Sequence, residues 1–306
     1  MGLMSTEPQL HHVMCQDAAG GHRMAYWQSG VADSPHVVLC VHGLTRQGRD
    51  FDTLAQALIQ RAALHAPIRM IAVDVVGRGQ SDWLADPTGY QIPTYAADML
   101  ALLAQLHAQA PITRLDWVGT SMGGLIGMAV GGQPGLPLPA PLRRLVLNDV
   151  GPVIEWAALQ RIGRYVGQVG HFQTIEEAAA AMWAVSTGFG PHTPEQWLAL
   201  SRPMVRAQPE GGFTLHYDPA LGAPFRAMTP EAAVQGEAML WQLYDHIQAH
   251  TLLLRGEQSD LLSANTAQAM TQRGPRARLV QFEGVGHAPT LIAPDQVAAV
   301  CDFLLA

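Results

Sequence analysis

The sequence has no long hydrophobic run, few cysteines and no surplus of basic residues. No segment offers about twenty consecutive apolar residues, which excludes a membrane-spanning helix. The three cysteines form no Cys-x-x-Cys pair, so we expect free thiols rather than a disulfide framework. A net charge of −7 argues against a nucleic-acid surface, because phosphate binding needs clustered Lys and Arg. Residues 1–14 contain neither a basic region nor an apolar stretch, so we expect no signal peptide and a cytoplasmic protein.

The composition provides ample material for a buried core. Of the 306 residues, 48% are apolar and 14% are charged, and large α/β folds of this length can form one unit. Short apolar runs alternate with longer amphipathic stretches, which is typical of a parallel sheet covered by helices. We therefore predict an α/β fold with an eight-stranded parallel sheet. The predicted strands are Leu10–Cys15, His22–Gln28, His36–Val41, Ile68–Asp74, Leu115–Gly119, Leu142–Asn148, Thr251–Arg255 and Arg278–Phe282.

Helices are predicted between these strands by apolar residues that recur at helical spacing. They cover Asp50–Ala63, Thr94–His107, the glycine-rich segment after Ser121, and Pro294–Leu305. Between Gly151 and about Gln235 no convincing buried strand appears, and amphipathic stretches dominate at Trp156–Gln168, Thr174–Val185 and Pro194–Met204. We predict an α/β core of residues 1–151 and 236–306, with a helical cap of residues 152–235 inserted after the sixth strand.

A candidate nucleophile lies directly after the fifth predicted strand. Gly119-Thr120-Ser121-Met122-Gly123 matches the pattern G-x-S-x-G. In that pattern the serine occupies a sharp, strained strand-to-helix turn, and the flanking glycines allow the backbone to approach closely. The pattern alone has low specificity because the chain contains 30 glycines. A strand before Ser121 and a helix after it supply the required context.

A second candidate segment, Val41-His42-Gly43-Leu44, follows the third predicted strand. Serine attack on a carbonyl requires two donors that face the developing oxyanion. We assign these donors to the backbone N–H groups of Met122, directly after the nucleophile, and Leu44, in this loop. His42 competes with His287 as a base, but its place at a strand end before the serine favours a structural role.

We look for the base and the acid after the serine in sequence. In folds whose serine lies in a G-x-S-x-G turn, the chain order is serine, acid, histidine. His287 lies in a glycine-rich loop after the last predicted strand, where it can reach the carboxyl edge of the sheet. Two acids are candidates to orient its imidazole. Asp260 follows the seventh strand, and Asp149 ends the sixth. We prefer Asp260, although it could instead cap the helix that follows it.

Two other features are assigned no chemistry. The loop from Asp74 to Asp82 has glycines for a tight turn, but it matches neither phosphate-binding pattern and is interpreted as scaffolding. His246 and His250 have helical spacing, but they lack a third metal ligand and an H-E-x-x-H pattern. We therefore predict no metal and no cofactor.

Together these motifs resemble the α/β-hydrolase superfamily, and the resemblance covers roughly residues 10–305 apart from the cap. The motifs that carry it are His42-Gly43, the Asp74 to Asp82 loop, Gly119-x-Ser121-x-Gly123, Arg255-Gly256 with Asp260, and Gly286-His287. The resemblance implies an eight-stranded, mostly parallel sheet with the second strand antiparallel, and a lid inserted after strand six. A serine nucleophile argues against haloalkane dehalogenases and epoxide hydrolases, which use aspartate.

Within the superfamily the chain looks like bacterial carboxylesterases, including those that act on short acyl or hydroxyalkanoate oligoesters. We therefore expect a small-molecule ester as substrate, cleaved by Ser121, His287 and Asp260. Hydrolases of carbon–carbon bonds or lactones share the same triad, although the former often carry a tryptophan after the histidine, where this chain has Ala288. A non-catalytic receptor on the same scaffold is a further alternative. Aromatic residues of the cap either line an acyl pocket or pack the cap helices.

Overall fold

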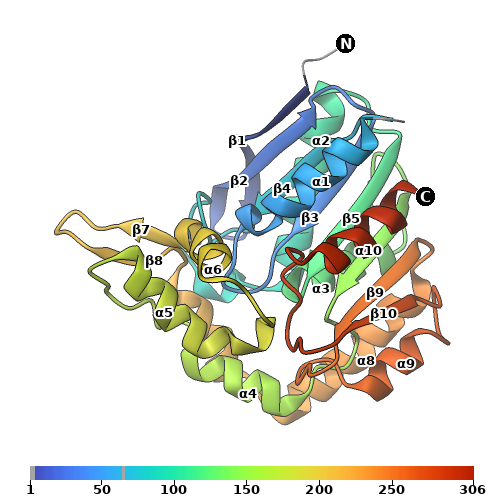
Figure 1. Cartoon of the computed structure of the whole chain (residues 1–306). Helices are drawn as coiled ribbons and strands as arrows, with labels where there is room; N and C mark the ends of the chain where they lie inside the picture. The colour runs from blue at the N-terminus through green and yellow to red at the C-terminus, as the bar shows by residue number, and fades with distance from the viewer. Residues whose placement is uncertain (1–3, 64–65) are drawn as a thin grey trace.

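The computed structural model describes residues 4–63 and 66–306, and its largest element is an eight-stranded sheet (Figure 1). The strand order is β1-β2-β4-β3-β5-β6-β9-β10. The strands are β1 (Met4–Asp17), β2 (Gly20–Val31), β3 (His36–Val41), β4 (Arg69–Asp74), β5 (Arg114–Thr120), β6 (Leu142–Asn148), β9 (His250–Gly256) and β10 (Arg278–Phe282). Residues 1–3, part of the N-terminal stretch considered above, lie outside the described residues.

Strand direction follows the prediction. β2 pairs antiparallel with both β1 and β4, and every other neighbouring pair in this sheet is parallel. The eight-stranded, mostly parallel sheet with an antiparallel second strand is thus confirmed. All residues of β3 and β4 are buried, because helices cover both faces of a parallel sheet and leave no solvated side.

The two faces of the sheet contribute to separate apolar clusters. Val37, Leu39 and Val41 of β3 belong to the cluster that includes residues of α2 (Ile92–Gln109), α3 (Met122–Gly132) and α8 (Pro230–His246). The alternate residues Val38 and Cys40 belong to the cluster formed with α1 (Asp52–Ala62) and α10 (Pro294–Leu305). This division follows from the two-residue period of a strand. α9 (Ala264–Met270) also packs on the first cluster.

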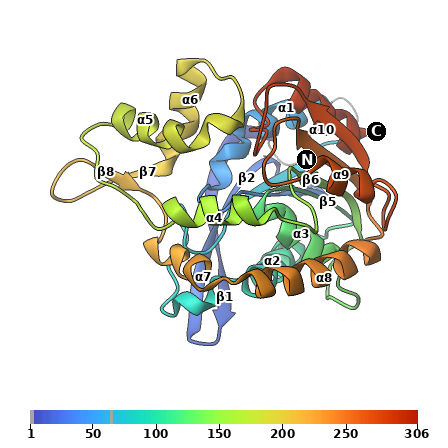
Figure 2. The same ribbon diagram turned by 90° about the horizontal axis from the view of Figure 1, so that it is seen from below.

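Between β6 and β9 the chain leaves the sheet and forms an inserted segment, residues 152–229, that lies at one end of the sheet (Figures 1 and 2). It contains α4 (Trp156–Tyr165), α5 (Ile175–Ser186), α6 (Pro194–Ser201), β7 (Val205–Ala207), β8 (Phe213–Leu215) and α7 (Gly222–Ala227). Short 3-10 turns lie at Gly48–Phe51, Pro87–Gly89, Thr187–Phe189, Arg202–Met204 and Pro219–Leu221.

The inserted segment has an apolar cluster of its own. Trp197 is buried beside α5, its indole N–H donates to the Ala179 carbonyl (2.8 Å), and its ring packs edge-on against Trp183. Trp183 and Trp197 therefore pack the inserted segment. The β7–β8 hairpin was not predicted, because strands of three residues are too short to show a periodic pattern. The division at 235/236 stays a prediction, and that boundary falls inside α8.

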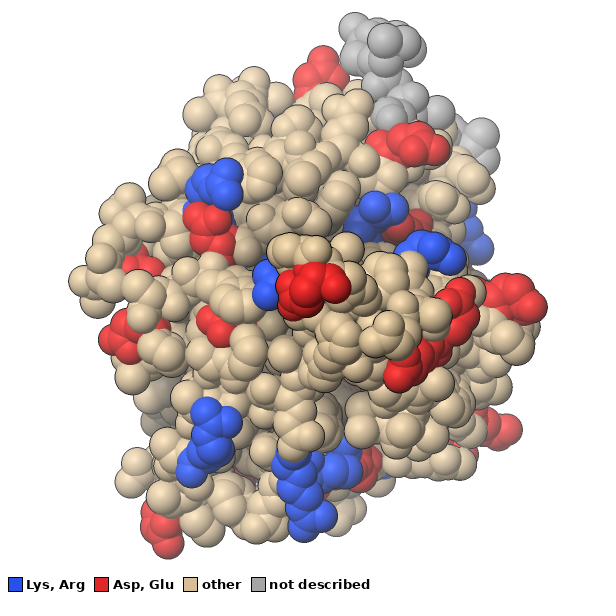
Figure 3. Space-filling view, turned by 90° about the vertical axis from the view of Figure 1, so that its left-hand side faces the viewer, with Lys and Arg blue, Asp and Glu red and all other residues tan. Residues whose placement is uncertain are grey.

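The surface carries charges of both signs. On the face in Figure 3, basic and acidic side chains are interspersed and uncharged residues predominate.

No helix within the described ranges combines the length and apolar character needed to cross a bilayer. Cys15, Cys40 and Cys301 are buried free thiols.

A buried ion pair joins the amino ends of three parallel strands, at the edge of the sheet opposite Ser121. Asp116 of β5 is fully buried, accepts hydrogen bonds from Arg143 of β6 and contacts the His36 ring of β3 at 2.7 Å. We expect Asp116→Ala to lower the free energy of unfolding by about 3 kcal/mol, because it leaves a largely buried guanidinium without its partner. Urea unfolding measures this.

The matched control is Asp302→Ala, which breaks the exposed pair between Asp302 and Arg61 and should cost far less. Equal losses in the two variants would show that Asp116 contributes no more than a surface pair.

Candidate active site

Ser121 occupies a sharp turn between β5 and α3. Its backbone has φ 51° and ψ −116°, a conformation that few non-glycine residues adopt. The two flanking glycines are required by space. A Cβ on Gly119 would lie 2.3 Å from the Gly123 carbonyl oxygen, and a Cβ on Gly123 would lie 1.9 Å from the Val41 carbonyl oxygen. The G-x-S-x-G spacing therefore follows from the close approach of α3 to β5 and β3.

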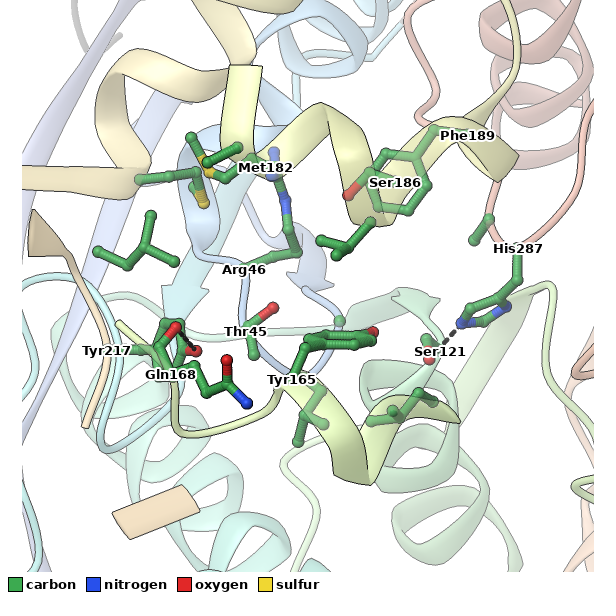
Figure 4. A pocket seen from close by; sticks show the side chains of 18 of the residues that line it. Thr45, Arg46, Ser121, Tyr165, Gln168, Met182, Ser186, Phe189, Tyr217 and His287 are labelled. Atoms are coloured by element: carbon green, nitrogen blue, oxygen red, sulfur yellow. Dashed lines mark hydrogen bonds between the residues drawn. The ribbon is translucent and has the colours of Figure 1, made fainter. Parts of the chain in front are cut away.

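Ser121, His287 and Asp149 form a continuous chain of hydrogen bonds. His287 Nε2 lies 2.9 Å from Ser121 Oγ, as Figure 4 shows, and His287 Nδ1 lies 2.8 Å from Asp149 Oδ2. In the neutral imidazole one nitrogen donates and the other accepts. With Nδ1–H donating to the carboxylate, Nε2 is left to accept the serine proton, which is the arrangement a general base requires.

Asp149 follows β6 directly and is fully buried. Its backbone φ is 56°, and three donors satisfy its carboxylate. Oδ1 accepts the Gly256 N–H (2.8 Å), while Oδ2 accepts the Ser259 hydroxyl (2.6 Å) as well as the His287 ring. These bonds offset the cost of burying a charge. They also fix the carboxylate against the loop that follows β9.

The prediction that Asp260 orients His287 is wrong. The Asp260 side chain is half exposed and forms a two-point ion pair with Arg161 of α4, at 2.8 and 3.0 Å. The reason lies in the turn after β9, where the Ser259 N–H donates to the Gly256 carbonyl. This turn directs Ser259 toward Asp149, and it leaves Asp260 facing the inserted segment.

The two predicted oxyanion donors lie beside the nucleophile. A Cβ on Gly43 would lie 3.7 Å from Ser121 Cβ, so the loop that carries Leu44 adjoins the serine. Met122 is the first residue of α3, and the first N–H groups of a helix have no partner within it. Among the described residues, none accepts a hydrogen bond from the N–H of Leu44 or Met122. Their role at an oxyanion stays a prediction.

His42 connects two loops at the same edge of the sheet. Its Nδ1 donates to the Gly43 carbonyl (2.6 Å), and its Nε2 accepts the Val75 N–H (2.9 Å). Both ring nitrogens are thus occupied, which fits the structural role preferred from the sequence. Complete burial lowers the pKa of His42 to about 3, so the ring is neutral at physiological pH.

Sequence reasoning missed Arg78, in the loop interpreted as scaffolding. Its side chain is fully buried, donates to the Leu44 carbonyl (2.7 Å) and contacts Met122 Sδ (3.3 Å). It therefore touches both predicted oxyanion residues. The guanidinium also lies over the Tyr95 ring, and within the described part of the chain it forms no ion pair with a carboxylate. No sequence signal separates this arginine from a surface one, because the contacts come from distant segments.

A cavity of about 340 Å³ opens on Ser121 and His287, within the usual size of small-molecule sites. In Figure 4, Ser121 and His287 lie at one end, while Gln168 and Tyr217 lie at the other. The walls combine the loop after β3 with the inserted segment, and most of their surface is apolar. The lining residues are Gly43, Leu44, Thr45, Arg46, Thr120, Ser121, Arg161, Ile162, Tyr165, Gln168, Gly170, Phe172, Ala181, Met182, Val185, Ser186, Phe189, Met204, Leu215, Tyr217, His287 and Ala288.

One group of potential metal ligands, Cys15, His22 and Asp98, occurs among the described residues. It belongs to β1, β2 and α2 and contains no residue of the cavity wall. The His22 ring nitrogens already face Asp17 and Asp98, each at 3.1 Å, so hydrogen bonds account for the burial of these polar groups. His246 instead donates to the Gln242 carbonyl on the exposed surface of α8.

The fold and the hydrogen-bonded serine, histidine and aspartate are features of a known protein family. Comparison with known proteins identifies that family. The model of the alpha/beta hydrolase family matches residues 38–300. This chain therefore belongs to the α/β-hydrolase family, as the sequence motifs indicated.

Individual relatives cover almost the whole chain. It is 46% identical to a 3-hydroxybutyrate-oligomer hydrolase of Cupriavidus necator, over 98% of this chain and 99% of that protein. It is 26% identical to a 2-(acetamidomethylene)succinate hydrolase of Mesorhizobium japonicum, over 88% and 87%. The crystal structure of an alpha/beta hydrolase from Novosphingobium aromaticivorans is 33% identical, has a TM-score of 0.80 and covers 100% of this chain and 99% of its own.

The burial of neutral His42 predicts a pH effect on stability. Between the ordinary histidine pKa of about 6.5 and the folded value of about 3, the unfolded chain binds a proton that the folded chain does not. His42 therefore contributes stability that is present above about pH 6.5 and is lost as the pH falls toward 3. We expect His42→Asn to make the fall in unfolding free energy shallower by up to about 1.4 kcal/mol per pH unit. Urea titrations from pH 4 to 7 measure the slope of the unfolding free energy against pH. An unchanged slope in His42→Asn would refute the lowered pKa of His42 in the folded protein.

Proposed function

We propose that this chain hydrolyses carboxylic esters through an acyl-enzyme intermediate on Ser121. The observation that carries the proposal is the hydrogen-bond chain from Ser121 Oγ through His287 to the buried carboxylate of Asp149. A serine hydroxyl is a weak nucleophile unless an adjacent base accepts its proton, and an imidazole works as that base only when its other nitrogen is fixed. This geometry meets both requirements.

The reaction proceeds in two steps. Ser121 Oγ attacks the ester carbonyl while its proton passes to His287 Nε2, and Asp149 stabilises the imidazolium. The backbone N–H groups of Leu44 and Met122 bind the oxyanion. As the tetrahedral intermediate collapses, the alcohol leaves with the proton from His287. A water then gives its proton to His287 and attacks the acyl-enzyme, releasing the acid and restoring the serine.

We infer that the substrates are short oligoesters of hydroxyalkanoic acids. The Cupriavidus necator protein, whose name states such a substrate, aligns over nearly the full length of this chain. The cavity supports this class, since it is largely apolar, has polar groups at both ends, and extends from Ser121 toward Gln168 and Tyr217. The Cupriavidus necator and Mesorhizobium japonicum relatives are both named for substrates that carry carboxyl groups.

The two aspartates give a matched test of the mechanism. Asp149→Asn should lower kcat on p-nitrophenyl butyrate and on a linear 3-hydroxybutyrate dimer by about 10³ to 10⁴-fold, because the amide no longer holds the imidazole in its basic tautomer. Asp260→Asn makes the same chemical change on the outer side of the loop and should leave kcat within about twofold. Ser121→Ala supplies the background rate. Turnover that survives Ser121→Ala, or losses that are equal at the two aspartates, would contradict the proposal.

A further inference from the structure

The charges on the cavity wall all have one sign. Arg46 and Arg161 line the cavity, together with the ionisable His287, and no Asp or Glu is among its lining residues. The substrate of a simple ester hydrolase needs no charge. Both arginines are paired with carboxylates, Asp50 and Asp260, but neither carboxylate is among the lining residues. The charged groups that face this largely apolar cavity are therefore cations, which favours a ligand that carries an anionic group.

The stem of Arg46 lies near the nucleophile. It follows Thr45 in the loop after β3, and a Cβ on Gly43 would lie 3.8 Å from Arg46 Cγ and 3.7 Å from Ser121 Cβ. The arginine stem and the nucleophile thus flank the same glycine. In Figure 4, Arg46 lies between the Ser121–His287 end of the cavity and the end formed by Gln168 and Tyr217.

The guanidinium of Arg46 is fixed in position but is not fully used. Asp50 accepts from its Nε and Nη2, both at 2.7 Å, and the Leu200 carbonyl of α6 accepts from Nη2 at 3.2 Å. The centroid of the Phe189 ring lies 5.8 Å from the guanidinium carbon, Cζ, of Arg46. Among the described residues, none accepts a hydrogen bond from Nη1. Because Nε and Nη2 are bound to Asp50 and Leu200, the N–H groups of Nη1 are the ones left to donate to a carboxylate.

Arg161 is placed differently. Its side chain is 39% exposed, and its Nε and Nη2 bind Asp260, which is itself half exposed. The Arg46 side chain is only 11% exposed. Because solvent screens an exposed charge and leaves a buried one effective, Arg46 provides the stronger anion contact.

We propose that Arg46 binds a carboxylate of the substrate, so that the preferred substrates are oligoesters that keep a free carboxyl end next to the bond being cleaved. This inference rests on the proposed ester hydrolysis. In a linear oligomer of a 3-hydroxy acid, the last ester bond lies only a few atoms from the terminal carboxylate. Hydrolysis there adds one water and releases the terminal hydroxy acid as the leaving alcohol. Arg46 suits such a carboxylate because its stem adjoins Gly43, beside the nucleophile.

The test compares two dimers that differ only in charge. One is the linear 3-hydroxybutyrate dimer with its free carboxylate, and the other is the same dimer with a terminal carboxamide. We expect the wild-type kcat/KM for the acid to exceed that for the amide by at least about tenfold, mainly through KM. Arg46→Gln should bring the ratio close to one. Chromatography of the released hydroxy acid and hydroxy amide measures both reactions.

Two further variants make the result specific. Arg46→Gln leaves the Asp50 carboxylate, which is 19% exposed, without its partner. The double variant Arg46→Gln/Asp50→Asn removes both charges of the pair and should show the same loss of preference. Arg161→Gln, which removes the other arginine of the wall, should keep the preference for the acid.

Equal wild-type rates on acid and amide would overturn the inference, and so would a preference that survives Arg46→Gln or disappears only in Arg161→Gln. Each of these outcomes leaves the proposed ester hydrolysis intact. If the wild-type protein hydrolysed no ester in a way that depends on Ser121, the proposed function itself would be rejected.

Discussion

The site depends on how closely the start of α3 packs against β3. Gly123 lies so near the Val41 carbonyl that no side chain fits between them. This contact sets the position of the turn at Ser121, and it places the first N–H of α3 beside the loop that carries Leu44. Trp117 reinforces the contact from within β5, because its indole N–H donates to the Gly123 carbonyl at 3.0 Å. The strained backbone of Ser121 is therefore held by packing on both sides.

Around that turn, several buried polar groups form hydrogen bonds with segments distant in sequence. Asp149 accepts from the loop after β9, His42 connects the loops after β3 and β4, and Arg78 reaches from the β4 loop to Leu44 and Met122. Asn148 donates to the Pro289 carbonyl, which fixes the loop that carries His287. Such networks are costly when broken and rigid when complete. A proton relay requires that rigidity.

The sequence predicted the parts of the fold that follow from local pattern. Buried strands such as β3 and β4 are short continuous apolar runs, and the turn at Ser121 has glycines that its geometry demands. Where two segments compete for one contact, local pattern is insufficient. Asp149 and Asp260 both follow strands at the reactive edge, and only the turn at Ser259 decides which of them faces His287. Arg78 was missed for the same reason, since its partners are far away in the chain. The β7–β8 hairpin has too few residues for any period to appear.

The central claim is that Ser121 is a nucleophile activated by His287 and Asp149. The most direct measurement is the rate at which a fluorophosphonate labels the intact protein, with the modified residue located by mass spectrometry. The account predicts rapid labelling at Ser121 alone, slowed by about a thousandfold or more in Asp149→Asn and unaffected in Asp260→Asn. Labelling at another residue, or equal labelling rates in wild type and Asp149→Asn, would contradict it.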